Sequence, residues 1–253
     1  MTKKLSASLI LAVLLCSSIS GKDLANQVSS GVYQFLPTAA NTPGAFGAFF
    51  KTKIDFLNPT TFSYQVFVTF YNKDGKQQPS KSFSIAPNEL KSWDNFLEAF
   101  GWTGAGALQF DSFLDPPGGS QDFEFIISAE IYTESPSGKY RTPVEVESGP
   151  VDTTWPAFSS GINVTSQERT NLGCVSFFQA QTVMAEIHGS DGTTLDTLPI
   201  PLVAYGWNQI PLNIPMTNGY VKWIPSASAH CWAVVVNNKS NDGNLIPAIQ
   251  YLH

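Results

Sequence analysis

Apolar and polar residues alternate with a period of two along most of the chain, and clusters of Pro, Gly, Asn and Asp separate the alternating segments. Neighbouring side chains on a β-strand point to opposite faces, so this pattern predicts half-buried antiparallel strands. The clearest segment, Tyr64–Tyr71, is rich in the β-branched and aromatic residues that favour strands. It leads into Asp74-Gly75, a sequence typical of a hairpin turn.

The same pattern is present a second time, where Thr182–His188 leads into Asp191-Gly192. Other segments match in the same order: Lys51–Ile54 with Arg169–Leu172, Trp93 with Trp207, Gly106–Phe110 with Gly219–Trp223, and Ile126–Val144 with Cys231–Ala248. Two copies of one β-unit therefore account for most of the chain.

This repetition predicts an all-β protein of two tandem immunoglobulin-like antiparallel β-sandwich domains, repeat 1 at residues 32–145 and repeat 2 at residues 155–253. Helix is predicted at one place, Trp93–Phe100. There Asp94 can cap the first turn, and Gly101 can end the last one.

The first 21 residues follow a different pattern, with Lys3 and Lys4 ahead of the apolar run Leu5–Leu15 and the small residues Ser18 and Ser20 after it. This is the pattern of a signal peptide at residues 1–21, and the apolar run is too short to span a membrane. Cys16 leaves a lipid-modified protein as an alternative, which the bulky neighbouring Leu disfavours. We therefore expect an exported protein that is periplasmic, surface-bound or secreted, with no transmembrane segment in the mature chain.

Composition supports this location. Charged residues make up 13% of the chain, and Ser, Thr, Asn, Pro, Gly and aromatic residues take their place, as in all-β extracellular proteins. The net charge of -6, from 14 basic and 20 acidic side chains, disfavours a nonspecific electrostatic contact with nucleic acid. We expect no nucleic-acid partner.

The order of short motifs resembles a known family. The motifs are Leu36–Ala40, Pro43–Gly47, Phe50–Ile54, Leu57–Pro59 and Gly106–Leu108. Together they are similar to an uncharacterised tandem β-sandwich repeat family of secreted bacterial proteins. The resemblance implies an exported pair of immunoglobulin-like sandwiches, and it brings no catalytic residues with it. The second copy departs from the pattern, because Asn58-Pro59 has no counterpart within Gly173–Phe178.

Two cysteines, Cys174 and Cys231, lie inside strand patterns of the second copy. An exported protein meets an oxidising environment, so we predict a disulfide between them that crosses from one sheet of the sandwich to the other. The two cysteines take the places of Phe56 and Ile126 in the first copy. Two buried free thiols are the alternative.

Candidate catalytic groups are sparse. His230 and Cys231 are sequence neighbours and point to opposite faces of a strand, so they cannot form a nucleophile and its base. Glu186, His188 and His230 have the residue types of a metal site, but they would meet only if their strands lay side by side. We predict that they are solvent-facing polar residues, and we expect no metal and no cofactor.

Paired carboxylates of the kind that hydrolyse glycosidic bonds are a further hypothesis, with Glu124 and Glu130 or Asp111 and Asp115 as the pairs. Solvated surface acids are the interpretation that we prefer.

Five aromatic residues lie at or near predicted strand edges and loops, where a flat ring can stack on a sugar or contact a partner: Trp102, Tyr132, Tyr140, Trp155 and Trp232. They are the candidate ligand-binding residues.

Three hypotheses for function follow. The first is a non-catalytic exported protein that presents its two sandwiches to a protein partner or an envelope assembly, in adhesion or assembly. The second is a carbohydrate-binding module that uses exposed aromatic rings. The third is a hydrolase with a site between the domains. The first needs no special residues, and we favour it over enzymatic activity.

Overall fold

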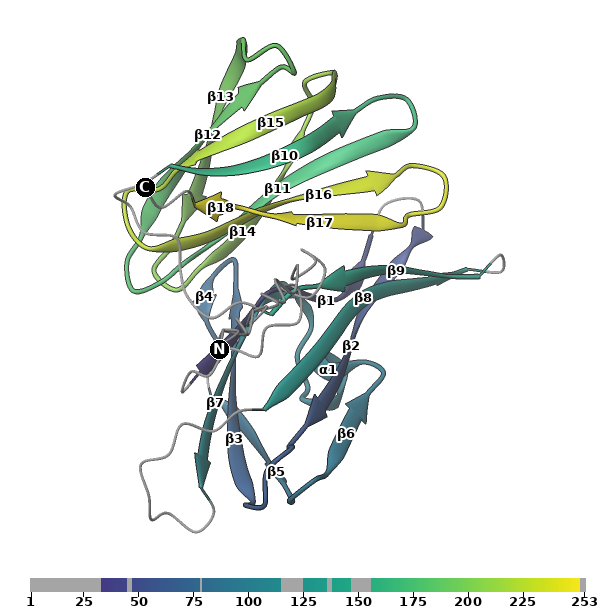
Figure 1. Cartoon of the computed structure of the whole chain (residues 1–253), viewed down its shortest axis with the longest axis vertical. Helices are drawn as coiled ribbons and strands as arrows, with labels where there is room; N and C mark the ends of the chain where they lie inside the picture. Colours follow the sequence, from purple (N-terminus) through teal and green to yellow (C-terminus); the bar gives the residue numbers. More distant parts are fainter. Residues whose placement is uncertain are drawn as a thin grey trace, which may run out of the picture.

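The computed structural model describes residues 33–44, 47–77, 79–114, 125–135, 138–146 and 156–250. Its strands pair antiparallel, which confirms the predicted all-β class (Figure 1). Within the described residues, strand pairing separates β1–β9, the N-terminal unit, from β10–β18, the C-terminal unit. The predicted signal peptide lies outside the described residues, as does most of the segment between the predicted domains. The boundaries at 145 and 155 therefore stay predictions.

The N-terminal unit contains β1 (Tyr33–Pro43), β2 (Phe49–Leu57), β3 (Tyr64–Asn72), β4 (Gly75–Lys76), β5 (Lys81–Ile85), β6 (Leu90–Trp93), α1 (Phe96–Ala99), β7 (Gly104–Leu114), β8 (Ile126–Ser135) and β9 (Gly138–Val144). The strands pair in the order β4-β3-β7-β1-β2-β8-β9, with β5 on β3 and β6 on β2. Strand β1 pairs with β7 for most of its length and with β2 at its end, and its register shifts between Leu36 and Ala39. The sheet therefore folds over on itself and encloses a core that includes Phe56, Val68 and Phe110.

The C-terminal unit contains β10 (Ala157–Val164), β11 (Glu168–Ser176), β12 (Gln181–His188), β13 (Thr194–Leu202), β14 (Trp207–Leu212), β15 (Met216–Ile224), β16 (Ala229–Asn237), β17 (Gly243–Pro247) and β18 (Ile249–Gln250). It is a sandwich of two sheets, one ordered β13-β12-β15-β10-β18 and the other β14-β11-β16-β17. Leu172 and Ala233 from one sheet pack with Val183 and Trp223 from the other in a single core.

The two units share one topology. When β10, β11, β12 and β13 are set against β1, β2, β3 and β5, and β14–β17 against β6–β9, most strand pairs correspond. The pairs β1–β2, β3–β4 and β10–β18 are the exceptions among the described strands. The two predicted Asp-Gly turns also correspond, and their glycines adopt positive φ angles, +104° at Gly75 and +85° at Gly192. Glycine adopts such angles without the steric cost that a side chain would bring.

The registers of two predicted matches are wrong. Cys174 lies opposite Cys231, whereas its counterpart Phe56 lies opposite Ile127 rather than Ile126. Trp93 lies opposite Ile54, and the counterpart of Ile54, Leu172, lies opposite Ile210. Trp93 therefore corresponds to Ile210 and not to Trp207. A period-two pattern fixes a face but not a register when loops differ in length, and a shift of one residue moves a side chain to the other face.

Helix α1 is shorter than predicted. Trp93 ends β6, and the N-cap residue is Asn95 rather than Asp94. The Asn95 side-chain amide donates to the Glu98 carboxylate, at 2.9 Å, and to the side-chain oxygen of Asn41, at 3.0 Å. It thereby ties the turn to β1. No helix among the described residues has the length and apolar character that a membrane span requires.

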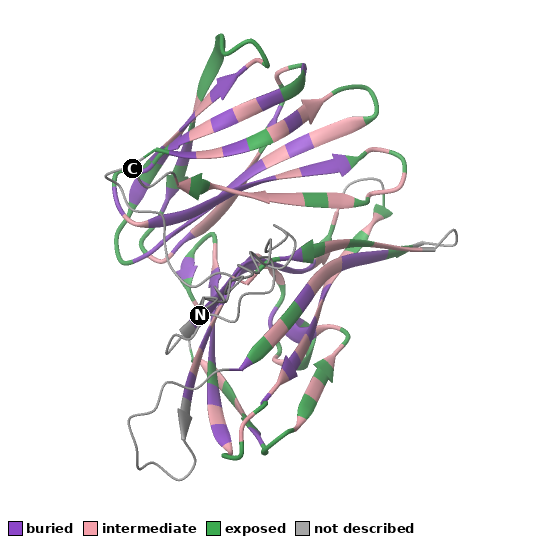
Figure 2. Cartoon of the chain, viewed as in Figure 1, coloured by how far each residue is buried: buried purple, intermediate pink, exposed green. Residues whose placement is uncertain are grey.

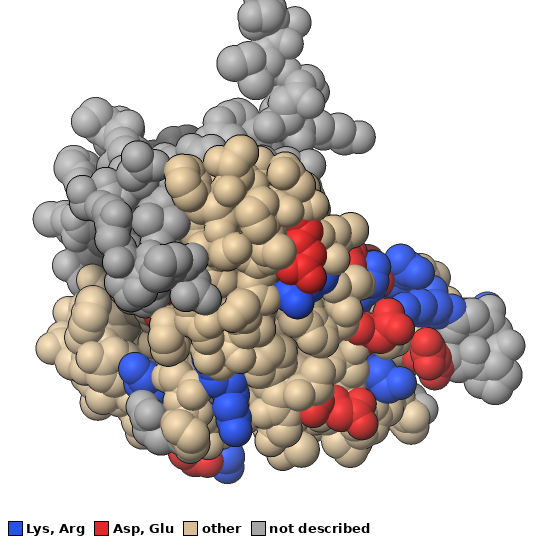
Figure 3. Space-filling model, turned by 90° about the horizontal axis from the view of Figure 1, so that it is seen from below, with Lys and Arg blue, Asp and Glu red and all other residues tan. Residues whose placement is uncertain are grey.

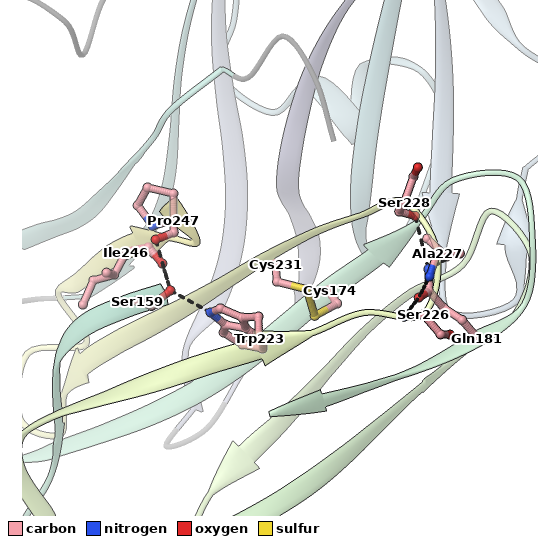
Figure 4. The surroundings of a disulfide bond; sticks show 11 residues. Ser159, Cys174, Gln181, Trp223, Ser226, Ala227, Ser228, Cys231, Ile246 and Pro247 are labelled. Carbon is pink, nitrogen blue, oxygen red and sulfur yellow. Dashed lines mark hydrogen bonds between the residues drawn. A yellow bond between two sulfur atoms is a disulfide. The ribbon is translucent and has the colours of Figure 1, made fainter. Parts of the chain in front are cut away.

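The predicted disulfide between Cys174 and Cys231 is confirmed, but it joins neighbouring strands of one sheet, not two sheets (Figure 4). The two residues lie directly opposite each other on β11 and β16, with a Cα–Cα distance of 4.1 Å. Nearby, the Ser159 side chain on β10 links one sheet to β17 of the other. The Trp223 indole donates to the Ser159 hydroxyl, at 3.0 Å, and that hydroxyl donates to the carbonyl of Pro247, at 3.0 Å.

Candidate docking faces

Three of the five predicted ligand-binding rings are buried, so their predicted exposure is wrong. Trp102 stacks on Phe70 with ring centroids 5.5 Å apart, inside the core of the N-terminal unit. Tyr132 is covered by the Lys139 ammonium group, 3.4 Å from the ring centroid. Trp232 lies between the two units. Neighbouring strands and side chains cover these rings, and sequence proximity to a loop does not reveal that cover.

The other two predicted rings are those of Tyr140 and Trp155. Tyr140 lies on β9 and is half-buried. Trp155 lies outside the described residues.

Glu186, His188 and His230 are not brought together, and the prediction that they face solvent is wrong for His188 and His230, which are buried. Glu186 and His188 lie on β12, whereas His230 lies on β16 in the other sheet. The Lys222 ammonium donates to the Glu186 carboxylate at 2.8 Å and holds the pKa of Glu186 below its usual value. The His188 ring stacks on Tyr220 with centroids 4.5 Å apart. Within the described ranges, no three His, Cys, Asp or Glu side chains gather as a metal site would need.

The predicted carboxylate pairs cannot be assembled from the described residues, because Asp115 and Glu124 lie outside them. Glu130 accepts a hydrogen bond from Arg141 at 3.1 Å. Asp111 accepts hydrogen bonds from the Gln109 amide, and burial raises the pKa of Asp111 above its usual value despite them. Glu130 and Asp111 therefore make hydrogen bonds that support the fold.

The two units contact each other through the outer faces of two sheets. The C-terminal unit contributes what we call the docking row, in which Val175 lies between its paired neighbours Trp207 and His230. The N-terminal unit contributes what we call the receiving face, the outer side of β1, β3 and β7 with Phe35, Tyr71 and Ala107. Outward-pointing residues of one sandwich thus become the interior of the interface.

Phe35 is the centre of this contact. Its ring stacks on that of His230, with centroids 5.0 Å apart, and meets Phe177 edge to face at 4.9 Å. The Trp207 indole donates to the backbone carbonyl of Pro37 at 3.1 Å. Phe35 and Trp232 are fully buried, so the contact excludes water from large apolar side chains.

A glycine makes room for Trp232 in this contact. A Cβ atom on Gly173, which lies opposite Trp232, would stand 2.4 Å from the indole ring. The counterpart of Gly173 in the N-terminal unit is Asp55, which lies opposite Ser128. The two units therefore differ on the face that the C-terminal unit uses for this contact.

A sequence signal for this interface exists in β16. The run from Cys231 to Val236 is apolar at every position, and both faces of the strand are buried almost throughout (Figure 2). In β8, the corresponding strand, polar residues alternate with apolar ones from Ser128 to Ile131. A strand that is apolar on both faces is buried on both faces. The sequence analysis did not compare these two strands, so it did not predict the docking row.

The counterpart of the docking row is exposed on the N-terminal unit. Leu57 lies between its paired neighbours Leu90 and Ile126, as Val175 lies between Trp207 and His230. Leu90 is 62% exposed and Ile126 is 40% exposed, whereas His230 is 2% exposed. We call Leu57, Leu90 and Ile126 the exposed row.

The receiving face also has a counterpart. Phe158, His188 and Tyr220 of the C-terminal unit hold the strand positions of Phe35, Tyr71 and Ala107. Phe158 and Tyr220 are half-buried, and their ring centroids lie 6.3 Å apart. We call these three residues the second receiving face.

Charged side chains lie beside the exposed row on the same sheet face. Lys53 and Asp55 form an ion pair at 2.8 Å, and Ser92 also donates to Asp55. Burial opposes the charge on Asp55, but the hydrogen bonds from Lys53 and Ser92 prevail and lower its pKa. Figure 3 shows both signs of charge interspersed over one side of the N-terminal unit. A mixed surface of this kind gives no long-range attraction for one sign of charge.

A further aromatic cluster borders the interface. Phe178 is 70% exposed, and its ring meets Tyr205 edge to face with centroids 6.0 Å apart. Tyr205 in turn stacks on Tyr71 of the N-terminal unit at 6.1 Å. Phe178 and Tyr205 adopt positive φ angles of 73° and 56°. Non-glycine residues pay a conformational cost of about 1–2 kcal/mol for such angles.

Comparison with known proteins gives little. No family model and no curated protein matches the chain. Two solved structures of Bacteroides uniformis β-glucuronidase 2 are similar to it in part, one a calcium-binding mutant and the other bound covalently to cyclophellitol-6-carboxylate aziridine. In each case the TM-score is 0.16, the identity is 12%, and the match covers 89% of this chain and 32% of that chain. The chain thus spans about a third of that enzyme's length. A similarity this small supports no statement about fold or function.

Proposed function

We propose that the protein is an exported, non-catalytic binding or structural protein that presents two β-sandwich units at the cell envelope or outside the cell, in adhesion or assembly. The observation that carries the proposal is the contact between the units, in which one sandwich docks on another through outer sheet faces. The exposed row has the same strand positions as the docking row, and its residues Leu90 and Ile126 are exposed to solvent. Exposed apolar surface of this kind marks protein contact sites. The shared topology of the units also supports, as a proposal, the resemblance to secreted tandem sandwich repeats.

The test is to isolate the protein from cells that produce it naturally, to size it without denaturant, and to identify what accompanies it. We expect a particle larger than one chain, or attachment to the outer surface. A free single chain without companions in every cell fraction and in the medium would contradict the proposal.

Carbohydrate binding is a second candidate, because the strongly exposed Phe178 ring and its neighbour Tyr205 offer a stacking surface. The test is binding to a glycan panel. If a glycan stacks there, Phe178→Ala should weaken binding about tenfold, as the loss of one ring contact implies, while Leu195→Ala at another exposed site should not change it. Absence of binding across the panel would remove this candidate.

The third hypothesis, a hydrolase with a site between the units, gains no support from the residues placed there. The described residues that form this contact are mainly aromatic and aliphatic.

A further inference from the structure

Proline lies on several strands at the margins of the sheets. It occurs on β9, β13, β14 and β17, as Pro143, Pro199 and Pro201, Pro211, and Pro247. Proline has no N–H group to donate, so it hinders a further strand from pairing at an exposed edge. Strand β5 is also marginal, and among the described strands it pairs only with β3. It contains no proline, so its edge lacks this protection.

Ser82 and Ser84 direct their backbone groups to the free edge of β5. Backbone groups along an antiparallel strand point alternately to one side and to the other. The Phe70 carbonyl on β3 accepts a hydrogen bond from the Gln77 N–H at 2.8 Å, on the side of β3 where β5 lies. Every second residue before Phe70 therefore faces β5 as well, including the partner of Phe83. Ser82 and Ser84, on either side of Phe83, point away from β3.

These two serines stand where the C-terminal unit has two prolines. Strand β13 is the counterpart of β5, in the register that the receiving face and the second receiving face share. In that register Pro199 takes the place of Ser82, and Pro201 takes the place of Ser84. The C-terminal unit thus has no N–H groups at the two positions where the N-terminal unit offers them. Both serines are exposed.

The sequence of β5 is symmetric about Phe83, with one serine on each side. When two copies of the strand pair antiparallel about this residue, Ser82 of each copy lies opposite Ser84 of the other. Residues that face each other in this way exchange both N–H···O bonds. A two-fold axis requires this self-complementarity, in which residue i contacts j and j contacts i. The edge of β5 therefore fits a second copy of itself.

Side chains on the inner face of β5 also favour this pairing. Phe83 is half-buried at the rim of the core, where its ring centroid lies 4.9 Å from that of Trp93 and 6.1 Å from that of Phe100. Its counterpart Ile200 is fully buried. Pairing about Phe83 makes the two Phe83 side chains cross-strand neighbours, which stabilise one another in sheets. The second copy thus covers a rim that the chain alone leaves partly open.

Charges at the two ends of β5 are complementary in this arrangement. Lys81 makes no ion pair with another described residue. In the paired strands it lies opposite Ile85 of the other copy. The next residue, Ala86, donates its backbone N–H to the Glu89 carboxylate at 2.7 Å, and the other oxygen of that carboxylate pairs with Lys91. Lys81 of each copy therefore approaches Glu89 of the other, and opposite charges meet at both ends.

We propose that a second copy of this chain pairs its β5 with β5 of the first, antiparallel and about Phe83, so that two N-terminal units share one continuous sheet. The inference rests on the proposed function and names a second copy as a partner for it. Figure 1 shows β5 at the end of the N-terminal unit remote from the C-terminal unit, so the contact between the units leaves this edge open. Each chain uses its one β5 edge, so the assembly closes at two chains.

The test uses sedimentation equilibrium of the purified chain at concentrations up to about 1 mM. We expect the mean mass of the wild type to rise with concentration from one chain to two and no further. Ser82→Pro combined with Ser84→Pro copies the edge of β13. This variant loses no hydrogen bond to β3, so it should retain the thermal unfolding of the wild type and sediment as one chain throughout. Ser82→Thr combined with Ser84→Thr keeps both N–H groups and should pair as the wild type does.

Amide hydrogen exchange of the wild type is a second measurement, and it covers the case in which the proline variant fails to fold. Exchange at Ser82 and Ser84 should slow in proportion to the fraction of paired chains. Ser92 is the internal control, because it faces the free edge of β6: Asn58 donates to the Glu89 carbonyl, which sets the alternation along that strand. A wild type that stays a single chain, a pair that the proline variant retains, or unchanged exchange at both serines overturns the proposal.

This proposal and the proposed function can fail separately. A protein that stays a single chain when purified but occurs with another protein in a large native particle contradicts pairing through β5 and retains the binding role. A single chain in both experiments contradicts both.

Discussion

At the scale of single residues, Asp111 and Asp191 show opposite pKa shifts on similar side chains. Asp111 lies on the outer side of β7, where burial raises its pKa and the Gln109 amide offsets this in part. Asp191 lies in the exposed turn after β12, where the hydroxyl and backbone N–H of Thr193 both donate to it and lower its pKa. The cause is desolvation in one case and hydrogen bonding to the charged form in the other.

These shifts predict opposite effects of neutralising the two groups. The folded-state pKa of Asp111 lies above its unfolded value, so its contribution to stability is present below the unfolded pKa and is lost as the pH rises through the folded pKa. Asp111→Asn should therefore raise Tm at pH 7, and the difference from wild type should shrink toward acid pH. Thermal unfolding at several pH values measures this.

Asp191→Asn is the matched control. The folded-state pKa of Asp191 is lowered, so its contribution is present above the unfolded pKa and is lost as the pH falls through the folded pKa. The variant should lower Tm slightly at pH 7 and should converge with wild type in acid. A decrease of Tm at pH 7 for Asp111→Asn would show that burial does not control that carboxylate.

The disulfide makes a prediction at the same scale. Replacing Cys174 and Cys231 together by Ala should lower the free energy of unfolding by about 2–4 kcal/mol, because the bond restricts the unfolded chain. Urea unfolding of the oxidised protein and of the double variant measures the loss. A reducing agent should destabilise the wild type and leave the variant unchanged. An equal effect of reductant on both would contradict a role of this bond in stability.

At the scale of elements, the two Asp-Gly turns are equivalent in sequence and different in surroundings. A Cβ atom on Gly192 would meet nothing within 4 Å, whereas one on Gly75 would lie 3.0 Å from the backbone carbonyl of Ala204 in the C-terminal unit. The turn before β4 is therefore part of the contact between units, and the turn after β12 is not.

Alanine substitutions should separate these two contributions. Gly192→Ala should cost about 1 kcal/mol of unfolding free energy, because its φ is positive. Gly75→Ala should cost more, because the same backbone cost is joined by the close approach to Ala204. Chemical denaturation of both variants gives the comparison. Equal losses would show that the turn can move away from the C-terminal unit freely.

At the scale of the whole molecule, the contact between units controls whether they unfold together. Phe35 is fully buried and contacts Phe177 and His230 from the other unit. Phe35→Ala should cost about 3–5 kcal/mol, the usual loss for a buried Phe, and should divide one unfolding transition into two. Calorimetry detects the division. Phe67→Ala, at a partly exposed position on β3, is the control and should retain a single transition. A single transition for both variants would show that the units are coupled elsewhere.

Much of the fold follows from local pattern. The alternation in segments such as Tyr64–Tyr71 identified strands, and the paired Asp-Gly turns identified two copies of one topology. The cysteines of the second copy predicted a disulfide that the structure contains. Each of these depends on neighbours in sequence, or on residue types whose chemistry leaves few partners.

The candidate site depended on tertiary structure. Trp102, Tyr132 and Trp232 are buried by residues distant in sequence, so position beside a loop misjudged their exposure. The register that places Cys174 opposite Cys231 depends on loop lengths, and the exposure of Leu90 and Ile126 depends on which outer faces meet. A sequence determines which faces of its strands are apolar, whereas packing of the units decides which of those faces is covered, because that choice depends on the fit of two whole surfaces.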